Sequence, residues 1–249
     1  MSWLRAWLRA LVFAYTAAAA ALSFSAYTAR TRSLAMRQVY FSAWQVLPGF
    51  TLFAALLSLV VIDITVRLAR EYNLAQFALE LAFRVVVLEL VPLLTALYVA
   101  LRSGAAIVTE VAVMANNGEL EELRSANIDP YEREFVPRIA AAAISVFTLT
   151  VVSCFVVMVI GYLVMYGASP WGFNEYTRTV ALVFGPGELA GFLLKCVAFG
   201  VVVAVIPIAA GLDATKDPRS VPVSVMGGMV RLFVALAVIE LVTLAVKYV

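Results

Sequence analysis

Four charged side chains lie where the surrounding sequence is almost entirely apolar, and they are the first candidates for chemistry. They are Arg84, Glu89, Lys195 and Arg231. An ionisable side chain at the centre of a bilayer costs about 2.5–3.5 kcal/mol, so such residues pair, reach the membrane surface or line a wet cavity. Glu80 and Arg84 also have the i,i+4 spacing of a helical ion pair. Two interpretations are open: ion pairs that fix helix packing, or a polar spot in a substrate path.

Histidine and the common enzyme sequence motifs are missing. The chain has no histidine, the commonest general base and a common metal ligand. It also lacks the phosphate-binding GxxxxGK[ST] loop, the HExxH motif and the GxSxG motif. Cys154 and Cys196 lie in different apolar segments without metal-ligand spacing, which is typical of inert packing residues. We therefore expect no catalytic residues, no metal and no cofactor.

Composition indicates a polytopic membrane protein. Hydrophobic residues make up 64% of the chain and charged residues only 14%, against about 25% in soluble proteins. The net charge of +2 leaves no broad basic surface for nucleic acid. Five segments are long and apolar enough to span a bilayer, at about 50–66, 74–113, 139–166, 189–210 and 221–246.

The second segment is too long for one straight span at about 1.5 Å per residue. It contains Arg84, Glu89 and Pro92, so we expect it to be kinked or to extend into the cytoplasm. Small residues predict close helix contacts elsewhere: Gly187 and Gly191 form a GxxxG pair in the fourth span, and a glycine pair lies in the fifth.

Residues 1–47 carry five arginines and no acidic residue. The alanine-rich run at 10–29 is compatible with a signal peptide, a spanning helix or a helix in the membrane interface. Trp3, Trp7 and the arginines favour an interfacial or obliquely inserted helix.

The longest charged block, residues 110–138, connects the second and third spans. Leu120 and Leu123 fall on one face of a short helix with Glu119 beside them, and one of the two preceding asparagines could cap its start. This pattern predicts a short amphipathic helix in water. It could dock a soluble partner, or it could be a solvated hairpin without one.

Loop charges indicate the orientation. If the N-terminus and residues 110–138 are cytoplasmic, eleven Lys and Arg residues lie inside and four outside. The outside set is Arg67, Arg70, Arg178 and Lys247. The C-terminus then faces the periplasm or exterior.

The stretch at 88–112 resembles the second-span signature of MlaE/YrbE-type permeases, which belong to MCE-associated ABC transporters. The matching positions are Glu89, Pro92, Leu94, Thr95, Ala96, Leu97, Arg102, Gly104, Ala105 and Glu110. The family's next helix and turn are matched by Met114, Glu119, Leu120, Glu121, Leu123, Ile128, Asp129 and Pro130. The resemblance continues through 194–200 and 211–214 and covers about 38–249. Leu88 departs from it, because the family has arginine there.

The resemblance implies an all-α membrane protein. It would have an N-terminal interfacial segment (1–47) and a permease domain (48–249) of five transmembrane helices, with a cytoplasmic coupling helix between spans two and three. Such permeases move phospholipid or another hydrophobic lipid between the bacterial inner membrane and a periplasmic ring of MCE-domain proteins. The implied partners are a second copy, a cytoplasmic ABC ATPase, the MCE-domain protein and the lipid. Hydrolysis of ATP belongs to the partner.

Two sets of site residues follow from the resemblance. We expect the contact with the ATPase at Met114, Glu119, Leu120, Glu121, Leu123 and Asp129. We expect the lipid pocket or gate at Arg84, Glu89 and Pro92, between spans one, two and five. Three other functions remain open: an ion-coupled secondary transporter, for which no internal repeat is visible, a membrane-embedded lipid enzyme, and a structural assembly subunit.

Overall fold

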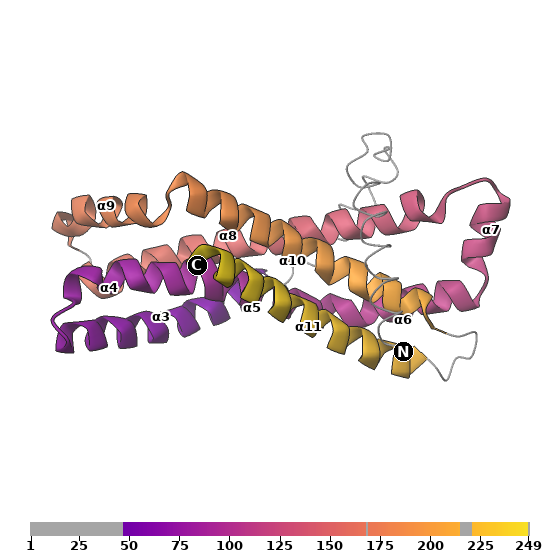
Figure 1. The fold of residues 1–249 in the computed structure, drawn as a ribbon, viewed down its shortest axis with the longest axis horizontal. Helices are drawn as coiled ribbons and strands as arrows, with labels where there is room; N and C mark the ends of the chain where they lie inside the picture. Colours follow the sequence, from indigo (N-terminus) through magenta and orange to yellow (C-terminus); the bar gives the residue numbers. More distant parts are fainter. Residues whose placement is uncertain (1–46, 168, 215–220, 249) are drawn as a thin grey trace.

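The computed structural model describes residues 47–167, 169–214 and 221–248, and all regular elements in these ranges are helical. The predicted interfacial segment lies outside them, apart from its last residue. Five helical stretches are long and apolar enough to cross a membrane. They are Leu47–Glu71, Phe77–Asn116, Arg133–Tyr166, Pro186–Leu212 and Val221–Lys247. The expected all-α fold with five spans is confirmed for the described residues (Figure 1).

Each span is built from one or more helical elements. The first is α3 (Leu47–Glu71). The second comprises α4 (Ala75–Ala82), the π-helix η3 (Phe83–Leu90), α5 (Val91–Val99), the π-helix η4 (Ala100–Gly104) and α6 (Ala105–Asn116). After α7 (Glu119–Ser125) and η5 (Tyr131–Phe135), the third span is α8 (Val136–Tyr166). The turn η6 (Pro170–Gly172) and the helix α9 (Phe173–Val183) lead to α10 (Pro186–Leu212) and α11 (Val221–Tyr248).

The π-helix η3 changes which side chains of the second span share a face. In an α-helix, residues five apart point about 140° away from each other. A π-helix closes i→i+5 hydrogen bonds and has more residues per turn, so the angle between residues five apart is much smaller. Arg84 and Glu89 have this spacing within η3 and therefore project to the same side.

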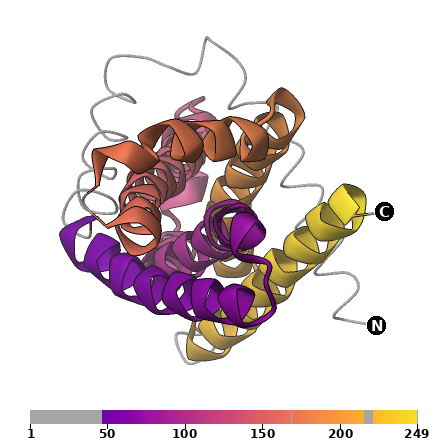
Figure 2. The same ribbon diagram turned by 90° about the vertical axis from the view of Figure 1, so that its left-hand side faces the viewer.

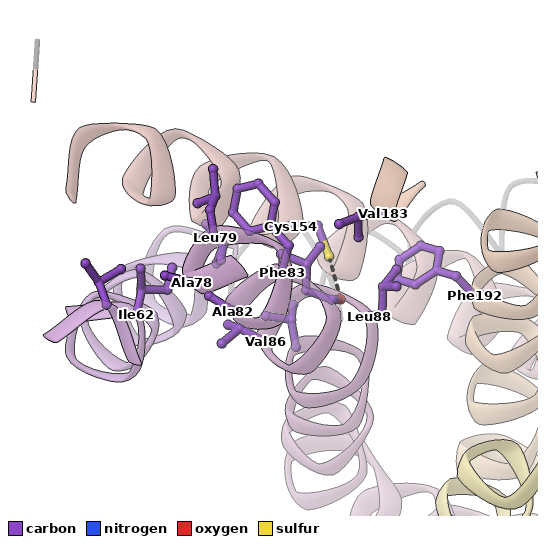
Figure 3. Packing of buried hydrophobic residues seen from close by; sticks show 14 of the residues in the cluster. Ile62, Ala78, Leu79, Ala82, Phe83, Val86, Leu88, Cys154, Val183 and Phe192 are labelled. Atoms are coloured by element: carbon purple, nitrogen blue, oxygen red, sulfur yellow. Dashed lines mark hydrogen bonds between the residues drawn. The ribbon is translucent and has the colours of Figure 1, made fainter. Parts of the chain in front are cut away.

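Pro92 ends the π-helical hydrogen bonding. In the π register, the backbone donor to the Val87 carbonyl would be residue 92, but proline has no N–H. The buried thiol of Cys154 donates to that carbonyl instead, at 3.5 Å (Figure 3). Cys154 is thus more than the inert packing residue that the sequence predicted, because it satisfies a backbone acceptor.

Side chains from four spans and α9 form one of the apolar clusters. Phe83 on η3 lies near its middle, between Ile62 of α3 on one side and Phe192 of α10 on the other, and Val183 of α9 belongs to the same cluster (Figure 3). The helix α9 was not predicted, and it is held by Tyr176, whose hydroxyl donates to the Met158 carbonyl at 3.0 Å. Burial raises the pKa of this hydroxyl, so it remains a neutral donor.

The helices α10 and α11 differ in how they are held. Half of the residues in the most apolar 18-residue stretch of α10 are buried, because α10 packs along α6, α8 and α11. In the most apolar stretch of α11, only 22% of the residues are buried. Figure 2 shows α11, in yellow, at the edge of the bundle. Its position must therefore depend more on specific contacts than on enclosure.

Replacing Gly200 with leucine should destabilise the bundle. A Cβ at Gly200 would lie 2.5 Å from the backbone Cα of Ala143, so α8 and α10 would have to separate. We expect Gly200→Leu to reduce the free energy of unfolding by about 1–3 kcal/mol. Gly227→Leu is the matched control, because a Cβ at Gly227 meets no atom within 4 Å. Equal thermal unfolding of both variants in detergent would contradict this account of the contact.

Candidate functional site

A cavity of about 580 Å³ lies between the second, fourth and fifth spans. This volume is within the range of about 300–1,000 Å³ that is typical of ligand sites. Its walls come from Leu88 and Glu89 on η3, from the segment around the start of α10 (185–195) and from the last turns of α11 (242–247). None of the lining residues belongs to α3, so this cavity differs from the expected pocket between spans one, two and five, which stays a prediction.

A buried lysine lies at the centre of the charges around this cavity. The Lys195 side chain on α10 is only 3% exposed. Its ammonium donates a hydrogen bond to Glu89 on η3. It also lies 2.9 Å from Glu240 Oε2 on α11, in an ion pair that lacks hydrogen-bond geometry. One ammonium group therefore joins carboxylates from two other spans.

The pairing continues outward from Glu89. Lys247 Nζ, near the end of α11, lies 2.9 Å from Glu89 Oε1 and 3.2 Å from Glu188 Oε2. Arg84 Nη1 lies 3.3 Å from Glu188 Oε1, and Arg84 Nε lies 3.1 Å from Glu80. The result is a series of alternating charges, which we call the ion-pair chain. It runs Glu80–Arg84–Glu188–Lys247–Glu89–Lys195–Glu240.

The three residues expected at the pocket have different positions. Glu89 lines the cavity. Arg84 is not part of its lining and is connected to it through the ion pair with Glu188, which does line the cavity. Pro92 is buried outside the lining, at the end of the π-helix that orients the other two.

Three members of the ion-pair chain were identified from the sequence neither as candidates for chemistry nor as pairing partners: Glu188, Glu240 and Lys247. Glu240 carries the same signal as Glu89, a carboxylate inside an apolar span, and that criterion would have found it. Glu188 and Lys247 lie near the ends of spans, where charged residues are common. Only their contacts across helices distinguish them. The same ion pairs join three spans and line part of the cavity, so both interpretations of the charges stay open.

The expected ATPase contact lies on and around α7, at the end of the molecule away from the C-terminus marked in Figure 1. Leu120 is 6% exposed and packs in a cluster with Phe135, Ile139 and Ile208. Met114 packs against the same cluster, and Leu123 is half-buried. Glu119, Glu121 and Asp129 are exposed. The leucines thus attach α7 to the bundle, and the acidic residues face outward.

The predicted asparagine cap of α7 is not formed. Gly118 occupies the cap position with a left-handed φ of 78°, which glycine adopts without strain. The Asn117 side chain donates to the Glu119 carboxylate at 3.3 Å and does not cap the backbone.

Arg138, at the start of α8, links α6 and η5 beside the α7 region. Its Nη2 lies 3.5 Å from Glu110 Oε2 on α6 and 3.8 Å from Glu134 Oε2 on η5. At the same end of the bundle, Arg231 on α11 lies 3.5 Å from Asp213 Oδ2, directly after α10. Arg231, a sequence candidate for chemistry, therefore belongs to a separate ion pair.

Comparison with known proteins decides the family. The family model described as "Permease MlaE" matches residues 35–246. The chain belongs to the MlaE permease family.

Relatives of this MlaE permease agree with the assignment. A probable ABC transporter permease of Synechocystis is 29% identical over 151 residues, covering 59% of this chain and 56% of the relative. One of Rickettsia prowazekii is 28% identical over 193 residues, covering 76% and 73%. The chloroplastic protein TRIGALACTOSYLDIACYLGLYCEROL 1 of Arabidopsis thaliana is 25% identical over 158 residues, covering 62% and 44%. The MlaE permease is thus a non-catalytic ABC transporter subunit, which implies an ATPase partner.

Removing the most deeply buried cation of the ion-pair chain should destabilise the MlaE permease strongly. Lys195→Met leaves the carboxylates of Glu89 and Glu240 without their shared partner, and we expect a loss of about 3–5 kcal/mol in the free energy of unfolding. Arg67→Met is the control: its pair with Asp63 is also a short contact, at 2.9 Å, but the arginine side chain is 75% exposed. Such a pair contributes about 0–1 kcal/mol. Similar thermal unfolding of the two variants in detergent would refute a central role for Lys195.

Proposed function

We propose that this MlaE permease moves lipids between the bacterial inner membrane and a periplasmic ring of MCE-domain proteins, driven by a separate cytoplasmic ATPase. The observation that carries the proposal is the cavity between spans two, four and five, whose wall contains Glu89 and Lys195. A pocket with apolar walls and a few fixed charges suits a ligand with a polar head and apolar chains. The name of the Arabidopsis relative refers to a galactolipid, which supports the same class of substrate.

The proposed orientation places α7 in the cytoplasm and the C-terminus in the periplasm, as the distribution of Lys and Arg favours. The ATPase then contacts the exposed acidic residues of α7, with Met114 and Leu123 supporting them. A second copy of the permease completes the membrane part, and the MCE ring lies on the periplasmic side. In the cavity, Glu89 holds or gates the lipid head group, Arg84 acts through Glu188, and Pro92 sets the geometry of η3.

The helix α10 offers a route from the ATPase contact to the cavity. Ile208 near one end packs in the cluster that contains Leu120 of α7. Lys195 lies thirteen residues earlier, about 20 Å along the helix, in the cavity wall. Movement of α7 against its cluster is thereby passed to a helix that carries the buried charge. This route uses packed side chains and one continuous helix, with no need for a flexible linker.

Reversing an exposed charge of α7 should weaken the ATPase contact. Glu121 is exposed, so Glu121→Lys leaves the packing of α7 intact. It places a positive charge where the ATPase surface is expected to complement a negative one. We expect about a tenfold loss of the co-purified ATPase, equivalent to roughly 1.4 kcal/mol, with unchanged thermal stability. Glu175→Lys on α9, also exposed, is the matched control at a distance. Because the ATPase is cytosolic, full binding by Glu121→Lys would count against both the contact and the orientation.

Neutralising Glu89 should reduce lipid binding and transport. Glu89→Gln removes the carboxylate that lies between two ammonium groups in the cavity wall, and we expect a several-fold loss of co-purified lipid. ATP-dependent lipid transfer from proteoliposomes should fall in parallel. Asp63→Asn, which also removes a paired carboxylate from a span but outside the cavity, is the control.

Each alternative predicts a different result in these assays. Lipid content and transfer equal to the parent would make Glu89 a packing residue only. Transport that follows a proton or sodium gradient without the ATPase would indicate a secondary transporter. Chemical conversion of the lipid by the permease alone would indicate an enzyme.

A further inference from the structure

Two glycines on α10 face the cavity without packing against any other part of the described chain. Gly187, Gly191 and Lys195 follow each other at four-residue intervals, so they share one face of α10, and all three line the cavity. A Cβ built on Gly187 or Gly191 meets no atom within 4 Å. The predicted GxxxG helix contact is therefore not made among the described residues.

Other glycines of α10 serve a different purpose. Cβ atoms at Gly200 and Gly211 would approach neighbouring helices to 2.5 Å and 2.7 Å, so close packing excludes a side chain there. At Gly187 and Gly191 the space is open, and it belongs to the cavity. The absence of side chains at these two positions therefore widens the cavity.

The two glycines lie between the start of α10 and the buried charge. From Gly187 to Lys195 is about 12 Å along the helix. Glu188 and Lys247, paired at 3.2 Å, line the same part of the cavity. Side chains at 187 or 191 would narrow the space through which a polar group reaches Lys195.

We propose that Gly187 and Gly191 determine which lipid head groups the cavity admits, by leaving room for large ones. The inference rests on the proposed function, because it assumes that a lipid head group occupies the charged part of the cavity. Leucine at either position would occupy that room and leave the ion-pair chain unchanged. The restriction should fall on large head groups more than on small ones, since a small head group needs less of the space beside α10.

The test compares two lipids that share their acyl chains and differ in head-group size. The complex of permease and ATPase is reconstituted in nanodiscs with equal amounts of phosphatidylinositol and phosphatidylethanolamine, re-extracted, and its bound lipids are measured by mass spectrometry. We expect Gly191→Leu to lower the ratio of bound phosphatidylinositol to phosphatidylethanolamine about tenfold. The control Gly227→Leu has equally open space on α11 but does not line the cavity, so it should keep the parental ratio.

The possible outcomes distinguish a failure of this inference from a failure of the proposed function. A parental ratio in Gly191→Leu with unchanged thermal stability would overturn the size selection, as would an equal loss of both lipids. A parental ratio accompanied by loss of a partner subunit would show that the glycines serve a helix contact. A parent protein that retains neither lipid would overturn the proposed function itself, and the inference with it. If Gly191→Leu does not fold, Gly187→Leu and Gly191→Ala are measured in the same way.

Discussion

A buried ammonium group that must be neutralised organises the middle of this MlaE permease. Lys195 is nearly inaccessible, and an unpaired cation in such surroundings would be strongly unfavourable. Its two carboxylate partners come from different spans, Glu89 from the second and Glu240 from the fifth. Satisfying one charge therefore fixes three helices relative to each other. These ion pairs matter most for α11, because few residues of its apolar stretch are buried in the described part of the chain.

The backbone of the second span makes this arrangement possible. The π-helical turn of η3 brings Arg84 and Glu89 toward the same side, where Arg84 pairs with Glu188 on α10 and Glu89 pairs with Lys195 on α10 and Lys247 on α11. Pro92 ends that turn, and the Cys154 thiol compensates the carbonyl that proline leaves without a donor. A residue that looks inert in the sequence thus stabilises the geometry of the charged site.

The sequence predicts the spans and the short helix α7 well, because apolar length and amphipathic spacing are local properties. It does not predict α9, which is short and lies between two long spans, or the π-helices, which depend on packing as well as on composition. Pairing of Lys247 with Glu89 and Glu188 depends on how α11 is placed against the other spans, which no local pattern determines. The pair Gly187 and Gly191 has the spacing of a helix contact, and only the three-dimensional surroundings reveal open space.

The distribution of packing along α10 gives the proposed transport cycle a physical basis. Its α7-facing end is enclosed in an apolar cluster, where close-packed side chains transmit displacement because they cannot be compressed. Its other end faces a cavity and is joined to η3 and α11 by ion pairs, whose partners can exchange along an alternating series. A displacement that enters through rigid packing is thus delivered to the part of the helix that is least enclosed. The same helix can therefore be stiff where we propose that the ATPase acts and adaptable where we propose that the lipid binds.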